Sequence, residues 1–212
     1  MSDHTLDCRA VLFDCDGVLV DSRQTAQDAW TVWAQTLGID PQKVLENLHG
    51  RRSVDTVKLY VPEPQQDTAL ALIEQSELAT AAATRPIPGG VELFTKLNSL
   101  AAVVTSASPA LVEARLTAAG YPAQRVVVTG CDVSTGKPSP QGYLRAAERL
   151  QVPIHECVIV EDSPAGVAAA RAAQPARVII VGGAVLPQHG DVPVRDLRQV
   201  RWTDNALHVT TT

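Results

Sequence analysis

The chain has 212 residues, 45% of them hydrophobic and 19% charged, which is the composition of an ordinary globular protein with a sizeable core. Its formal net charge of −5 argues against a broad nucleic-acid surface. No apolar stretch approaches the roughly 20 residues of a membrane-spanning helix. Residues 1–4 lack the basic and apolar character of a signal peptide. We therefore expect neither a nucleic-acid nor a membrane partner.

The four cysteines, Cys8, Cys15, Cys131 and Cys157, are scattered along the chain, and no two of them form a CxxC pair. This usage is typical of reduced thiols in a cytoplasmic protein. Cys15 and Cys157 are interpreted as small apolar residues of strands. A cytoplasmic location is therefore expected.

The first third of the chain combines one strand with a series of helices. The apolar run Val11-Leu12-Phe13 predicts a buried strand. Helical spacing follows at Ala26, Trp30, Trp33 and Leu37. Further helices are predicted over residues 41–48, from an N-cap at Ser53 to residue 60, and from an N-cap at Asp67 to residue 83. No strand is predicted between residues 22 and 84.

The rest of the chain alternates between helices and strands. Strands are predicted over residues 101–104, 126–128, 157–160 and 178–181, and helices end near residues 100, 119, 150 and 173. This alternation predicts an α/β fold, with a doubly wound parallel sheet covered by helices on both faces. The all-helical segment at residues 22–84 is then an insertion after the first strand. Residues 1–21 and 85–212 form the core, and the proline- and glycine-rich residues 85–90 form a hinge.

Two aspartates stand immediately after the first predicted strand. Asp14 and Asp16 are one residue apart, and Gly17 follows them. Open α/β sheets bind ligands beyond the carboxyl ends of their strands, so this position is typical of a site. Carboxylates held this close repel one another, and Mg²⁺, which prefers oxygen ligands, is the usual compensation. For the Asp-x-Asp pair alone, an acidic turn is an equally good interpretation.

Polar side chains also follow three of the later strands. Ser106 follows the second strand, Lys137 lies in a loop beyond the third, and Glu161-Asp162 follows the fourth. Each has an ordinary alternative: Ser106 or Ser108 as a helix N-cap, Lys137 as a solvated lysine, and the acidic pair as a helix-dipole partner. Parallel strands bring these groups to one edge. Together they form the set that phosphoryl transfer requires: a metal, a fixed cation, neutral donors and a nucleophile.

In this order the motifs resemble those of haloacid dehalogenase (HAD) superfamily phosphatases. The four motifs are Asp14-x-Asp16-Gly17-Val18-Leu19-Val20-Asp21-Ser22, Val103-Val104-Thr105-Ser106, Gly136-Lys137-Pro138 and Val160-Glu161-Asp162-Ser163-Pro164-Ala165-Gly166. The resemblance covers essentially the whole chain. It is strongest to bacterial sugar-phosphate phosphatases, in the branch that also holds phosphoglycolate phosphatase and β-phosphoglucomutase. It implies a Rossmann-like core with a helical cap domain.

The resemblance implies a role for each acidic motif residue. Asp14 would be the nucleophile, which forms an aspartyl-phosphate, and Asp16 would be the general acid and base. Mg²⁺ would be held by the Asp14 side chain, the Asp16 backbone carbonyl and Asp162. Glu161 would act on the metal through a water molecule.

The resemblance also assigns the groups that bind the substrate. Ser106, Ala107 and Lys137 would bind the phosphoryl oxygens. The helical segment would be a mobile lid, and Arg51, on a loop between two of its helices, would contact the leaving group. For the neighbouring Arg52, a substrate contact and a solvated basic turn are both open, and a contact from His49 is open as well.

These assignments predict a Mg²⁺-dependent phosphatase for a small phosphorylated sugar or polyol, acting as a monomer. The alternatives are a phosphomutase of the β-phosphoglucomutase type and a phosphoglycolate phosphatase. Ala26 stands where β-phosphoglucomutases carry a histidine, which favours hydrolysis. A dehalogenase needs a single acid here, so Asp16 argues against it. A phosphonatase needs an amine in the lid, where Lys43 and Lys58 are the only lysines. A non-catalytic phosphosugar sensor does not need the complete set of motifs.

Two positions depart from the family pattern. Pro109 follows Ser108 where many relatives carry a polar or basic residue, so one phosphate contact is expected to be missing or replaced. Gln174-Pro175 stands where the family often has a glycine after a helix. This second change is expected to affect local stability rather than chemistry.

Overall fold

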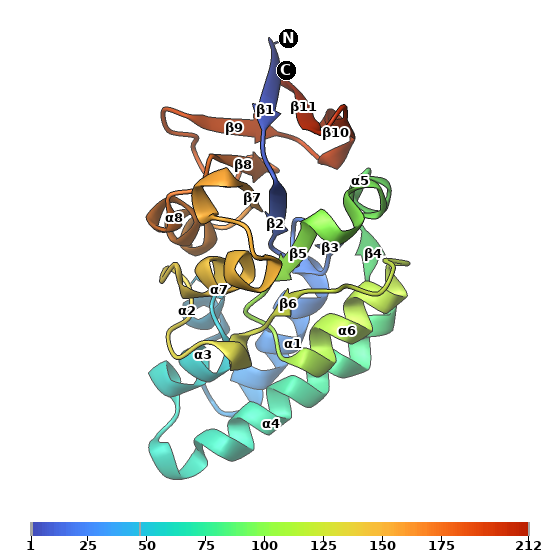
Figure 1. Ribbon diagram of the computed structural model, residues 1–212. Coiled ribbons are helices and arrows are strands. Elements are labelled where there is room, and N and C mark those ends of the chain that lie inside the picture. Colours follow the sequence, from blue (N-terminus) through green and yellow to red (C-terminus); the bar gives the residue numbers. More distant parts are fainter. Residues whose placement is uncertain (1, 47, 212) are drawn as a thin grey trace.

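The computed structural model describes residues 2–46 and 48–211, and its centre is a six-stranded parallel sheet (Figure 1). The strands lie in the order β6-β5-β2-β7-β8-β9. Their bounds are β2 (Ala10–Phe13), β5 (Ala101–Val104), β6 (Val127–Val128), β7 (Cys157–Glu161), β8 (Arg177–Val181) and β9 (Asp191–Val194). The chain adds β5 and β6 on one side of β2, and β7 to β9 on the other. The order therefore reverses at β2, and the predicted doubly wound parallel sheet is confirmed.

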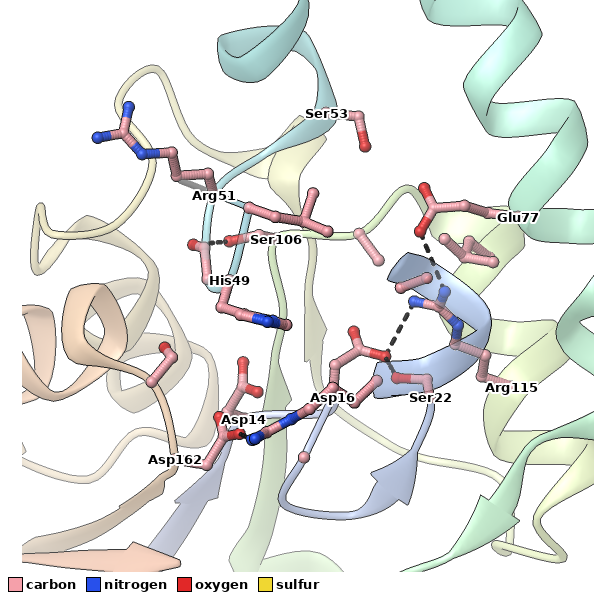
Figure 2. A pocket seen from close by; sticks show the side chains of 18 of the residues that line it. Asp14, Asp16, Ser22, His49, Arg51, Ser53, Glu77, Ser106, Arg115 and Asp162 are labelled. Atoms are coloured by element: carbon pink, nitrogen blue, oxygen red, sulfur yellow. Dashed lines mark hydrogen bonds and ion pairs between the residues drawn. The ribbon is translucent and has the colours of Figure 1, made fainter. Parts of the chain in front are cut away.

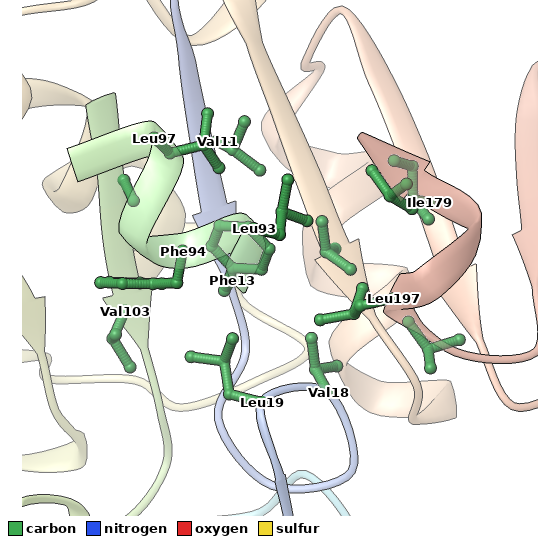
Figure 3. Packing of buried hydrophobic residues seen from close by; sticks show 14 of the residues in the cluster. Val11, Phe13, Val18, Leu19, Leu93, Phe94, Leu97, Val103, Ile179 and Leu197 are labelled. Atoms are coloured by element: carbon green, nitrogen blue, oxygen red, sulfur yellow. The ribbon is translucent and has the colours of Figure 1, made fainter. Parts of the chain in front are cut away.

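Helices cover both faces of this sheet. They are α5 (Gly90–Leu97) and α6 (Pro109–Ala118) on one face, and α7 (Gln141–Leu150) and α8 (Pro164–Ala173) on the other. Successive residues of β2 point to opposite faces, so Val11 and Phe13 pack with α5 and α6, and Leu12 packs with α7 and α8. In Figure 3 the Phe13 ring lies against Phe94, with ring centroids 5.7 Å apart. Burial on both faces explains why β2 is apolar throughout.

An all-helical segment separates β3 (Val20–Asp21) from β4 (Arg85–Pro86). It comprises α1 (Arg23–Thr36), α2 (Pro41–Leu45), α3 (Ser53–Tyr60), α4 (Glu63–Thr80) and a short 3₁₀ helix (Ala81–Ala83). β3 and β4 pair with each other, so the two chain crossings lie side by side. The segment has its own hydrophobic cluster around Trp30, Trp33 and Ile73, and Trp33 Nε1 donates to the Ala69 carbonyl at 2.8 Å. We call this segment, residues 22–84, the helical insertion.

Two predicted helix starts are wrong. Arg52, not Ser53, occupies the N-cap position of α3, and its backbone is extended there. α4 starts at Glu63 after Pro62, so Asp67 lies inside the helix instead of capping it. Amide hydrogens in the first turn have no partner within the helix, so Pro64, which lacks one, fits there at no cost. This favours a helix that starts at Glu63. The predicted end of the second helix includes residue 47, which lies outside the described residues.

Six of the strands were not predicted, among them the short β3 and β4 that flank the helical insertion. β9 extends the parallel sheet beside β8. β1 (Ser2–Asp7), β10 (Val200–Thr203) and β11 (Ala206–Thr211) form a separate antiparallel sheet in the order β1-β11-β10. Only Leu6 of β1 is buried, so this strand carries almost no apolar pattern. Its six register pairs with β11 join the two ends of the described chain, as Figure 1 shows.

The cysteines are free thiols, and Cys15 and Cys157 are buried, as expected of small apolar residues. Cys157 is the first residue of β7, and Cys15 lies just beyond β2. Across the described ranges, none of the helices combines the length and the apolar character that a membrane crossing would demand.

The exposed residue that ends α8 provides a test of local strain. Gln174 has φ +58°, a left-handed conformation that costs a side-chain-bearing residue free energy and costs glycine almost none. We expect Gln174→Gly to raise the free energy of unfolding by about 0.5–1 kcal/mol, as measured by urea denaturation. Gln75→Gly, the same change inside α4, should lower it by about 1 kcal/mol. Equal effects at the two positions would contradict the assignment.

Candidate active site

The three strands at the centre of the sheet deliver their polar residues to one pocket. Asp14 follows β2, Ser106 lies beyond β5 and Asp162 follows β7, and both β5 and β7 pair with β2. Asp16, Ala107 and Arg51 line the same pocket. Figure 2 shows the view into it, and the cavity volume is about 90 Å³. The predicted convergence on the carboxyl edge of the sheet is therefore present.

A lysine lies within a cluster of three buried carboxylates. Oxygens of Asp14, Glu161 and Asp162 all lie within 4.8 Å of one another. Lys137 Nζ donates to both Asp14 and Glu161, and its side chain is only 7% exposed. The alternative of a solvated lysine is wrong for Lys137. Among the described residues these three carboxylates face two cations, Lys137 and Arg23, and an excess of negative charge remains.

Glu161 is fully buried, and protein donors surround its carboxylate. Its Oε1 accepts from Lys137 and, at 2.7 Å, from the Tyr143 hydroxyl. Its Oε2 accepts from the backbone amides of Asp162 at 2.9 Å and of Ser163 at 3.2 Å. This pattern fixes Glu161 as the anchor that holds Lys137 against Asp14.

The clustered charges shift the ionisation of the site in different directions. Burial raises the pKa of Asp14 well above its usual value; Lys137 opposes this shift, while Glu161 and Asp162 add to it. Burial, followed by the charge of Glu161, raises the pKa of Asp162 to about 7. Burial lowers the pKa of the Lys137 ammonium group, but the charges of Asp14 and Glu161 raise it by more, so the net shift is upward. Oxygen ligands with unfavourable mutual repulsion are the donor set that a hard divalent cation fits.

Gly17 allows the loop after β2 to approach the acidic cluster closely. Its φ is +87°, and a Cβ built there would lie 2.0 Å from Asp162 Oδ2. No other residue fits this position without displacing Asp162. The glycine of the Asp-x-Asp-Gly motif therefore has a steric cause.

Asp16 faces a different part of the pocket from the acidic cluster. Its Oδ1 accepts from the Ser22 hydroxyl at 2.5 Å and from an Arg115 guanidinium nitrogen at 2.9 Å (Figure 2). The Asp16 side chain is not one of the clustered carboxylates, so its predicted role as a metal ligand is left to its backbone carbonyl. The same arginine donates to Glu77 of α4 at 3.1 Å.

The two serines in the loop after β5, Ser106 and Ser108, make different contacts. Ser108 is the N-cap of α6 and accepts from the Leu111 amide, and Pro109 fits the first helical position. Ser106 does not cap the helix; its hydroxyl donates to the Gly50 carbonyl of the helical insertion at 2.8 Å. The Ala107 amide, predicted to bind phosphate, donates to Thr105 Oγ1 at 3.0 Å.

The loop between α2 and α3 carries three basic residues with different environments. The His49 ring points toward Asp14 and Asp16, whereas the exposed Arg51 lines the pocket but directs its guanidinium away from them (Figure 2). Arg52 is neither a solvated residue nor part of the pocket that contains Asp14. It pairs with Asp55 and donates to the Val133 carbonyl at 2.9 Å, which ties the insertion to the loop that leads to Lys137.

Four polar residues of the site were not found from the sequence: Arg23, Glu77, Arg115 and Tyr143. Each lies on a helix and meets its partner across a long sequence separation. Arg115 stands among the apolar residues of α6, between Val112 and Leu116, on the buried side. A charged residue at an apolar helical position is the signal that could have identified it.

Comparison with known proteins gives the family. A family model described as haloacid dehalogenase-like hydrolase matches residues 8–174. The chain belongs to this family, as its motifs predicted, and it is a hydrolase by family. It is 38% identical over 172 residues to hexitol phosphatase A of Escherichia coli, covering 78% of this chain and 80% of that protein. It is 32% identical over 189 residues to 2-deoxyglucose-6-phosphate phosphatase 1 of Saccharomyces cerevisiae, covering 76% and 75%.

A solved structure confirms the fold. The β-phosphoglucomutase of Clostridium difficile superposes with a TM-score of 0.81 at 20% identity, over 92% of this chain and 94% of that one. At this identity the likeness concerns architecture alone. The predicted HAD-type fold is confirmed.

Burial of Asp162, together with repulsion from Glu161, predicts a pH-dependent stability. Because the pKa of Asp162 is about 7 in the folded protein and about 4 when unfolded, the unfolded state loses this proton first. The free energy of unfolding of the metal-free protein should therefore fall as pH rises from about 4 to about 7. Chemical denaturation in EDTA at pH 5 and pH 8 should show a smaller fall for Asp162→Asn than for the wild type.

The exposed Asp67 provides the matched control for this measurement. Asp67→Asn should retain the wild-type pH dependence. If Asp162→Asn also retained it, the raised pKa assigned to Asp162 would be contradicted.

Proposed function

We propose that the chain is a Mg²⁺-dependent phosphatase that hydrolyses a small phosphorylated sugar or polyol through an aspartyl-phosphate on Asp14. The observation that carries this proposal is the buried contact of Lys137 with Asp14 inside the acidic cluster. This arrangement combines a nucleophile, a fixed cation and a set of oxygen ligands at one sheet edge. The relatives, named as a hexitol phosphatase and a 2-deoxyglucose-6-phosphate phosphatase, support a sugar or polyol phosphate as the substrate.

The first step is transfer of the phosphoryl group to the enzyme. A carboxylate oxygen of Asp14 attacks phosphorus, and the bond between phosphorus and the leaving oxygen breaks. Asp16, entering as the carboxylic acid, gives its proton to that oxygen and releases an alcohol. Lys137 stabilises the charge on the phosphoryl oxygens, and the Ser106 hydroxyl joins it by turning from the Gly50 carbonyl to the substrate.

The second step returns the enzyme to its starting state. Asp16, now a carboxylate, takes a proton from water as that water attacks phosphorus. The bond between phosphorus and Asp14 breaks, and inorganic phosphate leaves. Asp14 is again a carboxylate and Asp16 is again protonated, so protons and charge balance over the cycle.

The clustered oxygens supply a fitting site for Mg²⁺. We assign the ion to the Asp14 side chain, Asp162 and the Asp16 backbone carbonyl, with Glu161 acting through a water molecule. When bound, Mg²⁺ neutralises negative charge at the transferring phosphoryl group. Burial disfavours the ionised form of Asp14, and a divalent cation held here would favour it.

The pocket favours a small polar leaving group. Its volume of about 90 Å³ is well below the roughly 300–1,000 Å³ of pockets for drug-sized ligands. His49, Ser53 and Glu77 line it with groups that hydrogen-bond hydroxyls, and Arg51 stands at its rim. We propose that the helical insertion, residues 22–84, is a cap domain that moves over this pocket, with β3 and β4 as the hinge.

The residues of the insertion favour hydrolysis over the related reactions. Ala26 lines the pocket at the position where the resemblance places the histidine of β-phosphoglucomutases. Lys43 and Lys58 are both exposed, so neither offers the buried amine of a phosphonatase. Release of the phosphoryl group to water is therefore the proposed outcome. The proposed enzyme acts as a monomer in the cytoplasm.

Substitution of the two aspartates tests the covalent mechanism. Asp14→Asn keeps the side-chain shape and removes the nucleophile, so turnover of sugar phosphates should be abolished while circular dichroism is unchanged. Asp16→Asn should also lose turnover but accumulate phosphoenzyme, because the second step lacks its base. Intact-mass spectrometry after acid quench measures the added phosphate. Near-normal turnover of Asp14→Asn would disprove the mechanism.

Removal of the divalent ion tests the cofactor. Excess EDTA should abolish turnover, and added Mg²⁺ should restore it. Because the ion binds the folded state, Mg²⁺ should also raise the melting temperature of the wild type. Asp162→Asn should show a much smaller rise. Undiminished turnover in EDTA would exclude the proposed metal dependence.

Substitution of Arg51 tests contact with the leaving group. Arg51→Ala should lower kcat/KM for a sugar phosphate. The loss should correspond to about 1.5–3 kcal/mol of transition-state stabilisation, which is typical of a hydrogen bond to a charged group. Acetyl phosphate, which carries no sugar, should be hydrolysed nearly as before. Arg125→Ala, another exposed arginine, is the control. Equal losses on both substrates would place Arg51 on the phosphoryl group, and no loss on either would leave it outside the site.

A further inference from the structure

Arg115 is a buried cation that joins the core to the helical insertion beside the proposed acid and base. Its side chain is 4% exposed, and it lies on α6, the helix that follows the Ser106 loop. One terminal nitrogen contacts Asp16 Oδ1 at 2.9 Å and the other contacts Glu77 Oε1 at 3.1 Å. Glu77 lies on α4, and α4 packs against α6. The three charged groups thus form a chain from the catalytic loop to the insertion (Figure 2).

The contacts on Asp16 are unequal between its two oxygens. Both Ser22 and Arg115 donate to Oδ1. No donor among the described residues contacts Oδ2, and Asp16 lines the pocket. An anchored Oδ1 fixes the direction of the other oxygen, which stays free for the leaving group. General acid catalysis requires this kind of fixed position, because the proton donor must lie within hydrogen-bond reach of its acceptor.

A stabilising role does not account for these buried charges. Placing an arginine and a glutamate out of water costs desolvation, and apolar residues of similar size commonly serve stability as well or better. Most neighbours of Arg115 on its face of α6 are apolar, including Leu111, Val112 and Leu116. The ion pairs therefore call for a reason beyond packing.

We propose that Arg115 is a positioning residue that holds Asp16 for proton transfer to the leaving oxygen, and that Glu77 makes this position depend on the seating of the helical insertion. The inference rests on the proposed phosphatase function. When α4 lies against α6, Glu77 occupies one side of the guanidinium and directs the other side to Asp16. When the insertion moves away, Arg115 loses its contact with Glu77. Arg115 is then held less firmly, so it no longer fixes the position of Asp16.

Two phosphate esters separate this role from a general loss of structure. The alkoxide leaving from glucitol 6-phosphate needs a proton, whereas the phenolate leaving from p-nitrophenyl phosphate does not. In Arg115→Met, rapid-quench measurement should show phosphoryl transfer from glucitol 6-phosphate slowed by about 10²-fold, the size of a lost general-acid contribution. Transfer from p-nitrophenyl phosphate should change by less than about threefold, with a nitrophenolate burst because Asp16 is also the base of the second step.

A second variant covers the possibility that Arg115→Met fails to fold with Glu77 left unpaired. Arg115→Met/Glu77→Met removes both charges and should fold, because neither remains buried alone. It should retain the loss on glucitol 6-phosphate and the burst on p-nitrophenyl phosphate. Recovery of the wild-type rate on glucitol 6-phosphate in the double variant would overturn the proposal, since the role of Arg115 would then be structural.

Glu77→Gln tests the link to the insertion. It keeps the shape of the side chain, and we expect a loss on glucitol 6-phosphate in the same direction but smaller than that of Arg115→Met. Glu74→Gln, one turn earlier on α4 and outside any ion pair among the described residues, is the matched control and should equal the wild type. Equal rates for the two glutamate variants would overturn the link to the insertion.

The remaining outcomes are distinguishable. Equal losses on both esters in a folded Arg115 variant, or no loss on either, would overturn the positioning role. A wild-type enzyme that transfers phosphate from neither ester would instead refute the proposed function itself.

Discussion

The site depends on the crowding of carboxylates at the carboxyl edge of the central strands. Asp14, Glu161 and Asp162 lie close enough to repel one another, and burial adds to the cost of each charge. Lys137 offsets part of that cost, and the remaining charge fits a divalent cation. The neighbouring structure follows from holding these groups in place: Tyr143 and two backbone amides fix Glu161, Gly17 lets its loop pass Asp162, and the sheet fixes the strands.

The central strands and their polar ends could be predicted because their causes are local. A strand buried on both faces must be apolar, so the sequence of β2 is a continuous apolar run that ends before Asp14. The same holds for β5 and β7, and parallel pairing then places their ends together without any knowledge of the side-chain contacts. Ser108 and Ser163 are N-caps for reasons confined to a few neighbouring residues.

Long-range pairings could not be predicted in this way. Arg115 meets residues 99 and 38 positions away in the chain, and Arg52 meets carbonyls about 80 positions away. The residues near each arginine in the sequence do not indicate which distant groups it will contact. β1 was missed for a related reason, because its exposed residues are held by pairing with β11 at the other end of the described chain and by one buried leucine, Leu6.

Three polar contacts between insertion and core fall beside groups that we propose for phosphoryl transfer. Ser106 donates to Gly50, Arg52 reaches the loop that leads to Lys137, and Glu77 reaches Asp16 through Arg115. A lid that merely covered a pocket could contact the core anywhere along its rim. Because these contacts fall on Ser106, on the lysine loop and, through Arg115, on Asp16, we propose that seating of the insertion affects all three together. On this proposal, the insertion would contribute to the geometry of the reaction as well as to the choice of leaving group.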